Sequence, residues 1–358
     1  MSATMRALVY HGANDLRLEE RARPEPGPSE AVLRVRACGI CGTDLRILAG
    51  AHRAYPDGTE RVPGHEMAGV IVARGRQADV AEGMAAFVAP NIGCGVCAPC
   101  RSGRVNLCLR PRALGITRDG AFAEEVLLPA DLIAQGNVLP APTDADPGAI
   151  ALVEPLACVL RGSRACAITE GDLVLIVGAG PIGLLHLQIA RLRAPRAIVV
   201  SQPSAMRRAQ ALRWGADRIV DPDREDLAAV VAELSDGQGA DVVIVAAPAP
   251  RAQEQAIELA AVGGRINFFG GLPRDRSRIT IDANIIHYKE IVVTGTTANT
   301  TEDCREALAL VATGQVDTAG LITARYPLDE GVDALTAAAS GQALKVVLEP
   351  MHGLWRRD

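Results

Sequence analysis

Apolar residues follow two different patterns along the chain. Between residues 155 and 295, short apolar runs typical of buried strands alternate with longer runs of helix-forming residues. The expected strands are 173–177, 197–201, 218–220, 241–246, 265–269 and 291–294, and the expected helices are 184–193, 205–214, 227–234 and 252–261. This strand–helix alternation predicts a doubly wound parallel sheet, so the fold class is α/β.

The flanking segments show another pattern. Residues 1–154 are rich in Gly, Pro and short apolar strands, such as 6–10, 31–35 and 67–73, and no helical period is sustained there. This pattern predicts a mainly β domain. After Thr296 we expect one helix, over 301–312, and a further apolar run over 345–348.

The strand at 173–177 ends in a glycine-rich turn. The run Gly178-Ala179-Gly180-Pro181-Ile182-Gly183 has the spacing G-x-G-x-x-G, directly between a strand and a helix. In such a turn the first glycine allows the tight bend, the second lets the backbone approach a pyrophosphate, and the third lets the helix pack close to the strand. The helix start offers free N–H groups to phosphates. The run predicts a dinucleotide site, and the alternative is a turn that binds nothing.

Length and charge narrow the function classes. A chain of 358 residues is too long for one ordinary core, which predicts two domains. A net charge of −5 argues against a nucleic-acid surface. No uncharged apolar run reaches membrane-spanning length, and the first residues lack the apolar core of a signal peptide. We therefore expect a cytoplasmic protein with a small-molecule partner, and neither nucleic acid nor membrane.

Four of the nine cysteines lie close together. Cys94, Cys97, Cys100 and Cys108 have the spacing C-x2-C-x2-C-x7-C, in a segment whose Gly, Ala, Pro, Arg and Ser content predicts a loop. Four thiolates complete a tetrahedral zinc shell without an open position, which is typical of a structural site. An iron–sulfur cluster is the competing interpretation, and a disulfide pair fits a cytosolic chain less well.

A second group of potential metal ligands is scattered along the chain: Cys41, the pair His65-Glu66, and Glu154. A thiolate, an imidazole and a carboxylate would leave one zinc position open for water or substrate, as catalytic sites need. Each residue also has an ordinary interpretation, as a buried thiol, a turn histidine or an acid at a helix start.

Taken together, these motifs resemble the zinc-dependent medium-chain alcohol dehydrogenases. The stretches C-G-I-C-G-T-D at 38–44 and G-H-E-x-x-G-x-V at 64–70, the four-cysteine loop and the glycine turn occur in that family's order. Segments 103–108 and 154–157 are similar to its sorbitol and polyol dehydrogenase branch. The resemblance implies a GroES-like β-rich catalytic domain (1–154, with 296–358 returning to it) and a Rossmann domain (155–295). It also implies NAD(P)-linked oxidation of a secondary alcohol, or the reverse.

The resemblance also implies roles for single residues. Cys41 and His65 would bind a catalytic zinc, separate from a structural zinc on the four cysteines. Glu66 and Glu154 would be ligands that exchange with water, and which of them binds directly stays open. Asp44 would orient His65. Thr43 would hydrogen-bond the substrate hydroxyl and pass its proton outward.

Two positions depart from the family pattern. Arg46 stands where a relay histidine is common. An arginine cannot shuttle a proton at neutral pH. We therefore expect the proton to leave through the nucleotide ribose and water, or through a glutamate. Gln202 stands at the end of the second Rossmann strand, where many members carry an acid for the adenosine ribose.

The change at Gln202 bears on the choice of nucleotide. An acid there repels a 2′-phosphate, and the uncharged amide does not. Ser201, Gln202 and Ser204 can donate hydrogen bonds, and Arg207 can pair a phosphate. We expect NADP or dual use, while NAD stays open because Gln202 can also bond a ribose and Arg207 can simply pack over the adenosine. Arg208 follows on the same helix and can likewise pair a phosphate, or it can simply face solvent.

The substrate and assembly are the least determined. Aromatic residues make up 3% of the chain, which favours a polar polyol, sugar or cyclitol, although a cyclic or terpenoid alcohol stays open. The alternatives of another class are a non-catalytic nucleotide- or zinc-binding protein and a zinc-free enone or quinone reductase. The apolar strand at 291–294 is expected at a sheet edge, which needs a partner and predicts a homodimer or homotetramer.

Overall fold

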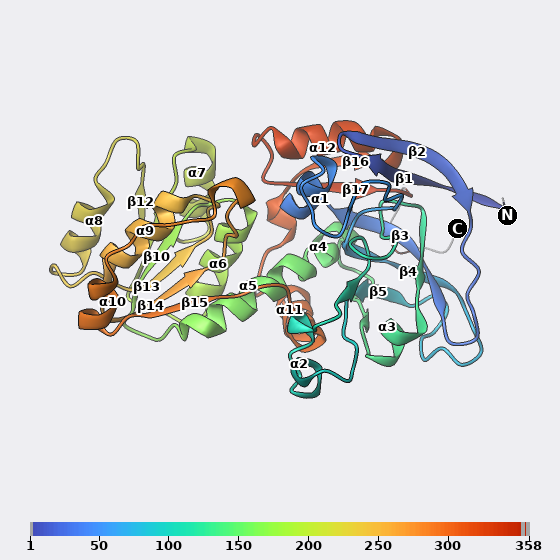
Figure 1. The fold of residues 1–358 in the computed structure, drawn as a ribbon, viewed down its shortest axis with the longest axis horizontal. Helices are drawn as coiled ribbons and strands as arrows, with labels where there is room; N and C mark the ends of the chain where they lie inside the picture. Colours follow the sequence, from blue (N-terminus) through green and yellow to red (C-terminus); the bar gives the residue numbers. More distant parts are fainter. Residues whose placement is uncertain (1–2, 352–354, 356–358) are drawn as a thin grey trace. The chain divides into compact units, whose positions relative to one another are not determined.

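The computed structural model describes residues 3–351 and 355 (Figure 1). Contacts divide the chain into two compact units, one formed by residues 1–157 and 298–358 and the other by residues 158–297. These limits lie close to the expected domain limits of 154/155 and 295/296. Each unit is described by itself below.

The second unit is built on a six-stranded parallel sheet in the order β12-β11-β10-β13-β14-β15. Its strands are β10 (Leu173–Val177), β11 (Ala197–Ser201), β12 (Arg218–Val220), β13 (Ala240–Val245), β14 (Ala260–Phe268) and β15 (Val292–Gly295). The strand order reverses at β10, since chain order leads from β10 to β12 on one side and from β13 to β15 on the other. Ligands of doubly wound sheets bind at such a reversal, and the glycine turn follows β10 directly.

Helices of this unit connect the strands. They are α6 (Pro181–Arg191), α7 (Ala205–Arg213), α8 (Leu227–Leu234), α9 (Pro250–Leu259) and α10 (Ala283–Lys289). The sequence did not predict α10. It contains no buried residue, so no apolar stripe marks it, and its start is fixed instead by the Asp282 carboxylate, which accepts a hydrogen bond from the Asn284 N–H.

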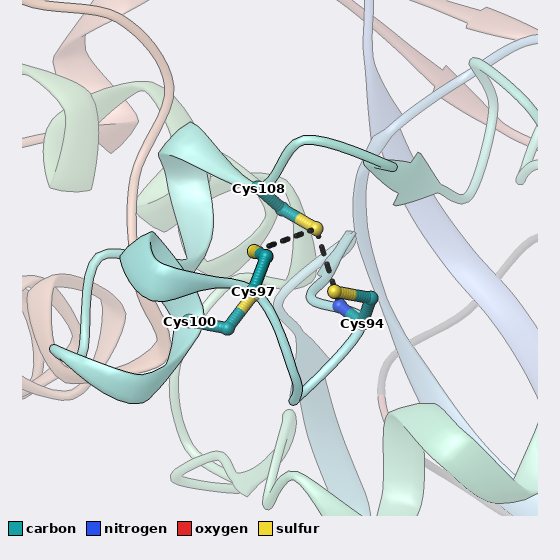
Figure 2. A group of neighbouring side chains, drawn as sticks. All are labelled: Cys94, Cys97, Cys100 and Cys108. Atoms are coloured by element: carbon teal, nitrogen blue, oxygen red, sulfur yellow. Dashed lines mark hydrogen bonds between the residues drawn. The ribbon is translucent and has the colours of Figure 1, made fainter.

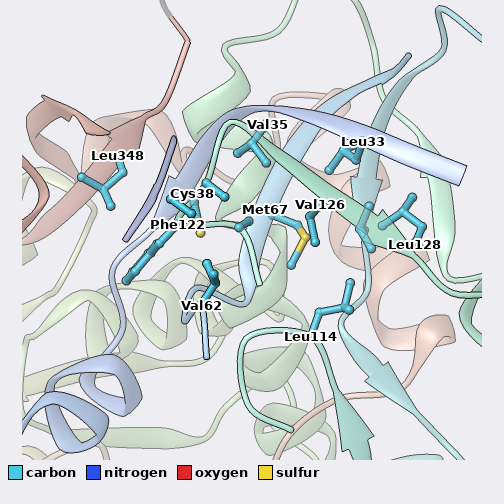
Figure 3. Packing of buried hydrophobic residues seen from close by; sticks show 14 of the residues in the cluster. Leu33, Val35, Cys38, Val62, Met67, Leu114, Phe122, Val126, Leu128 and Leu348 are labelled. Carbon is cyan, nitrogen blue, oxygen red and sulfur yellow. The ribbon is translucent and has the colours of Figure 1, made fainter. Parts of the chain in front are cut away.

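The first unit contains a seven-stranded sheet. Its strands are β3 (Ala31–Gly39), β4 (Glu66–Arg74), β5 (Ala85–Val88), β8 (Glu125–Leu128), β9 (Val138–Pro140), β16 (Ile322–Pro327) and β17 (Lys345–Glu349). β3 is buried along its whole length because β4, β8 and β17 all pair with it. Figure 3 shows the apolar core that these strands share, in which Leu33, Met67 and Leu348 come from three different strands.

Shorter elements complete the first unit. They are the hairpin β1 (Thr4–Gly12) and β2 (Asp15–Ala22), the small strands β6 (Asn91–Ile92) and β7 (Arg112–Ala113), and the helices α1 (Gly42–Leu48), α2 (Ala98–Arg101), α3 (Ala130–Ala134), α4 (Pro147–Ala151), α11 (Thr301–Ala312) and α12 (Gly331–Ala339). A longer helix, α5 (Val153–Cys166), begins in the first unit.

The C-terminal segment is more structured than the sequence predicted. Besides α11 and β17 it contains β16 and α12, so the expectation of one helix and one apolar run was incomplete. β16 consists of part-buried and exposed positions and contains only one strongly apolar residue, Ile322. No apolar run in the sequence therefore marks this strand. The segment nevertheless belongs to the first unit, because β17 pairs antiparallel with β3. None of the helices described has the length and apolarity needed to span a bilayer.

Candidate metal and dinucleotide sites

Sheet register brings three of the scattered ligands together. β3 and β4 pair antiparallel with Gly39 opposite Glu66, so the chain that leaves β3 toward Cys41 passes the start of β4. Ligand atoms of Cys41, His65 and Glu66 all lie within 4.8 Å of one another. Gly39 is required there, because a Cβ atom at this position would come within 2.1 Å of Glu66 Oε2.

Asp44 connects two of these residues. Its Oδ2 atom accepts a hydrogen bond of 2.8 Å from the Cys41 N–H, and its Oδ1 atom lies 3.4 Å from His65 Nδ1. Burial alone would lower the pKa of His65, but the Asp44 carboxylate and the Cys41 thiol raise it well above its usual value. With Nδ1 directed at Asp44, Nε2 is the ring atom left for a metal.

Glu66 has a partner that sequence reasoning missed. Lys345 Nζ donates a hydrogen bond of 2.7 Å to Glu66 Oε1, and both side chains are buried. Burial is the largest single effect and lowers the pKa of Lys345, but the charge and hydrogen bond of Glu66, together with the charges of Cys41 and Asp44, outweigh it, so the net shift is upward and the ammonium stays charged. The only signal in the sequence was a lysine at the start of an apolar run.

Glu154 is the predicted ligand that does not join the group. It lies in α5 and is 6% exposed, and its Oε1 atom accepts a hydrogen bond of 2.7 Å from Asn299 Nδ2. The Asn299 Oδ1 atom in turn accepts one of 2.9 Å from Asn91 Nδ2. Burial raises the pKa of Glu154, and the charge of Glu66 raises it further. Neither asparagine was singled out in the sequence.

Thr43 and Arg46 form a contact one helical turn apart in α1. Arg46 Nη2 donates a hydrogen bond of 3.1 Å to Thr43 Oγ1. The threonine is half-buried and the arginine is exposed. Because the hydroxyl oxygen accepts from Arg46, its own proton is free to be donated to another group.

The four loop cysteines converge as their spacing predicted (Figure 2). The expected loop contains two short helical turns, α2 and a 3₁₀ turn over Val105–Leu107, which bring the thiols inward. The N–H groups of Val96 and Cys97 lower the pKa of Cys94 to about 6, and burial raises that of Cys100 to about 11. None of the nine cysteines is in a disulfide.

The glycine turn has the geometry of a phosphate cradle. Gly178 has a φ of +100°, which favours glycine, and a Cβ atom at Gly183 would come within 1.8 Å of the Gly178 carbonyl oxygen. At Gly180 the same added atom would meet only Arg207 Nη1, at 4.0 Å. The space over Gly180 is therefore open, and a guanidinium borders it.

Gln202 lies directly after β11, where the family acid was expected. It is 5% exposed, and its Oε1 atom accepts a hydrogen bond of 3.1 Å from the Ser204 N–H, which leaves the NH2 group as the donor for a ligand. The alternative in which Arg208 simply faces solvent is wrong. Its guanidinium donates to the Gln202 and Pro203 carbonyls and pairs with Asp221 at 2.9 Å, so it holds the turn that carries Gln202.

Comparisons with known proteins agree with this architecture. Residues 27–141 match the model of an alcohol dehydrogenase GroES-like domain, and residues 181–313 match that of a zinc-binding dehydrogenase. The chain is 32% identical to a sorbitol dehydrogenase of Halalkalibacterium halodurans (97% of this chain, 100% of the relative). It is 34% identical to an L-threonine 3-dehydrogenase of Thermococcus kodakarensis (99% of each) and 34% identical to an L-galactonate-5-dehydrogenase of Escherichia coli (91% and 92%).

Among solved structures, the fold is similar to that of a protein from Sinorhizobium meliloti described as a zinc-binding dehydrogenase and bound to NADP. The TM-score is 0.90 and the sequences are 36% identical, over 98% of this chain and 100% of that one.

Proposed function

Because the chain belongs to the zinc-dependent medium-chain alcohol dehydrogenase family, we propose that it oxidises a secondary alcohol of a polyol, sugar or cyclitol to a ketone with NAD or NADP, or catalyses the reverse reduction. The observation that carries this proposal is the grouping of Cys41, His65 and Glu66 around one point, with Thr43 two residues after the cysteine. A thiolate, an imidazole and a carboxylate suit zinc and leave a coordination position for the alcohol.

Cys41 and His65 would hold the catalytic zinc, with Glu66 as the first exchangeable ligand. Bound there, zinc would supply Lewis-acid polarisation of the alcohol oxygen, and a bound nicotinamide would accept the hydride. Asp44 would fix the His65 ring through Nδ1, as it is already placed to do at 3.4 Å. Glu154, held by Asn299 outside the three-ligand group, would be the second exchangeable ligand.

Thr43 would bind the substrate hydroxyl and accept its proton. Arg46 cannot relay that proton further, because a guanidinium does not deprotonate at neutral pH. Its hydrogen bond to Thr43 Oγ1 would instead fix the hydroxyl rotor and favour the outgoing proton of Thr43. Release would then pass through the nucleotide ribose and water, or through a glutamate.

The dinucleotide would bind at the glycine turn of the second unit. Gly180 leaves room for the pyrophosphate at the start of α6, and Pro181, Ile182 and Gly183 form the first turn of that helix. Ser201 and Gln202 would bond the adenosine ribose. Arg207 borders the open space over Gly180, and the uncharged Gln202 in place of an acid supports NADP or dual use.

Structural zinc on the four loop cysteines, an oligomeric state and a cytoplasmic location complete the proposal. The edge strand β15 exposes Val292 (53%) and Val293 (37%), which supports a homodimer or homotetramer, since apolar sheet edges pair with other chains. Nine cysteines without a disulfide suit a reducing compartment. Sedimentation at micromolar concentration tests the assembly, and a 37.5 kDa monomer would contradict it.

Metal analysis combined with a substrate panel tests the function. About two zinc ions per chain, with turnover of polyols, sugars or cyclitols and either nucleotide, is the expected result. One zinc without turnover would indicate a binding protein, and no zinc would indicate the reductase alternative.

A further inference from the structure

One cation beside the metal-ligand group has no acidic partner. Arg46 is exposed on α1, and in the described part of the chain its guanidinium has a single side-chain hydrogen bond, to Thr43, and no carboxylate within 4.0 Å. Some other arginines have an acidic partner: Arg208 contacts Asp221, and Arg265 contacts Asp172 at 2.7 Å. A guanidinium has five N–H donors, so most of those on Arg46 remain for a ligand.

The nearest carboxylate of α1 is already committed. Asp44 is 2% exposed, and its two oxygens face the Cys41 N–H and the His65 ring. It therefore does not neutralise Arg46, whose side chain lies on the exposed side of the same short helix. The positive charge next to Thr43 is left for solvent or a ligand.

The surroundings of Arg46 add to its charge. His52 is half-buried, and its Nδ1 atom accepts a hydrogen bond of 3.3 Å from the Ala54 N–H, which places the proton of the neutral ring on Nε2. Burial lowers the pKa of His52, the charges of Arg46, Arg53 and His65 lower it further, and Asp44 opposes this. Helix α1 and the segment after it thus present two permanent cations, Arg46 and Arg53, and the neutral N–H donor of His52.

We propose that Arg46 binds a carboxylate of the substrate, so that the preferred alcohol is a sugar acid, such as an aldonate, over the neutral polyol with the same carbon skeleton. This inference rests on the proposed dehydrogenase function. Arg46 contacts Thr43, the residue proposed to bind the reacting hydroxyl, so a carboxylate on the guanidinium and a hydroxyl on the threonine would orient one small molecule from two points. Guanidinium and carboxylate groups match in a bidentate geometry, which gives direction as well as charge.

The same charges select among carboxylates. An amino acid would bring an ammonium group toward Arg46 and Arg53, where it would meet like charges. A sugar acid carries only hydroxyl groups besides its carboxylate, and these can bond the His52 N–H and water. The sugar acid is therefore the class that this surface fits.

The test compares aldonates and alditols with the same carbon skeleton, such as galactonate and galactitol, on the zinc-loaded enzyme. We expect the wild type to favour the aldonate in kcat/KM by at least about tenfold, or roughly 1.4 kcal/mol. Arg46→Gln should lower the aldonate-to-alditol ratio by about tenfold, mainly through the KM of the aldonate, and Arg46→Lys should lower it less. The ratio cancels any effect of the substitution through Thr43, which both substrates share.

Two further measurements separate the outcomes. Arg224→Gln removes an exposed arginine of the second unit and serves as the matched control, whose ratio should equal that of the wild type. Calorimetric titration with galactonate gives a readout that needs no turnover, and Arg46→Gln should weaken this binding.

An unchanged ratio in Arg46→Gln, or a wild type that prefers the alditol, would overturn the inference and leave the dehydrogenase function standing. A rise confined to the KM of the nucleotide would show that Arg46 binds a phosphate of the dinucleotide, which also overturns it. If the zinc-loaded wild type oxidises neither substrate nor any other alcohol in the panel, the proposed function itself fails and this inference falls with it.

Discussion

Lys345 Nζ lies 2.7 Å from Oε1 and 2.6 Å from Oε2 of Glu66, and both side chains are almost completely buried. Three strands produce this contact. Glu66 in β4 is opposite Gly39 in β3, and Gly39 is opposite Val347 in β17, two residues after the lysine. Since Gly39 carries no side chain, the carboxylate can occupy the space above it. The lysine balances a carboxylate that a metal would also use.

Removing the lysine should leave Glu66 as an unpaired buried charge. We expect Lys345→Met to lower the free energy of unfolding of the metal-free protein by about 3–5 kcal/mol, as breaking one side of a buried ion pair usually does. Urea denaturation measures this. Lys345→Arg keeps the charge and is the control. The double variant Lys345→Met/Glu66→Gln should recover most of the loss, and a double variant as unstable as the single one would show that the charge is not the cause.

The proposed zinc ligands should be essential for turnover but not for folding. We expect Cys41→Ala and His65→Ala to lower kcat by more than tenfold, because Lewis-acid stabilisation supplies several kcal/mol of the barrier reduction. Steady-state kinetics with an active alcohol, together with circular dichroism, measures both properties. A folded variant that keeps more than about a tenth of the wild-type kcat would exclude the zinc mechanism.

The four-cysteine loop should depend on its metal. Its only regular elements are two short helical turns, so the thiolate–zinc bonds are expected to hold it in place. Cys97→Ser should lower the melting temperature or dissociate the oligomer, with a smaller effect on the chemical step. Melting curves with and without a chelator test this. If neither the substitution nor the chelator changes the melting temperature, the loop needs no metal.

Nucleotide preference should respond to the residue after β11. Gln202→Asp places a negative charge where a 2′-phosphate would lie, so we expect kcat/KM to shift toward NAD by at least about tenfold, or roughly 1.4 kcal/mol. Because Arg208 holds the backbone of this turn, the substitution should not displace it. A wild type that already prefers NAD by about a hundredfold would show that another feature rejects the 2′-phosphate.

A buried histidine in the second unit should make stability fall with acid. His186 is fully buried, its two ring nitrogens have no hydrogen-bond partner among the described residues, and it packs edge-on against Phe269 at 4.7 Å. Burial lowers the pKa of His186 from 6.5 to about 3. Above pH 6.5 the ring is neutral in both states, and between 6.5 and 3 only the unfolded chain takes up the proton. The free energy of unfolding should therefore drop by roughly 1.4 kcal/mol per pH unit in that window.

His186→Leu tests this directly. The substitution removes two unsatisfied polar atoms, so we expect it to raise the free energy of unfolding at pH 7 by about 1–3 kcal/mol. Between pH 7 and pH 5, the free energy of unfolding of the variant should also decrease by roughly 2 kcal/mol less than that of the wild type. Urea titrations at both pH values measure the two effects, and His287→Gln, at an exposed histidine of the same unit, is the control. Equal acid sensitivity in His186→Leu and the wild type would assign the loss to other groups.

Local patterns determined much of this protein from the sequence alone. The glycine turn, the four cysteines and most strands of the parallel sheet were recognisable because each depends on residues a few positions apart, where spacing sets the turn, the metal chelation or the burial. Helix α10 and strand β16 escaped the same reasoning because they bury too little apolar surface to leave a periodic signal.

Only the tertiary structure decided which distant residues meet. The pairing of Lys345 with Glu66 depends on the register of three strands. The hydrogen bond from Asn299 to Glu154 joins residues that are 145 positions apart in the sequence. The sequence identified Arg46 as an unusual residue, but its lack of an acidic partner is known only once every nearby carboxylate is placed. Spacing along the chain sets local geometry, whereas the charge balance of a buried site is set by side chains that packing brings in from elsewhere.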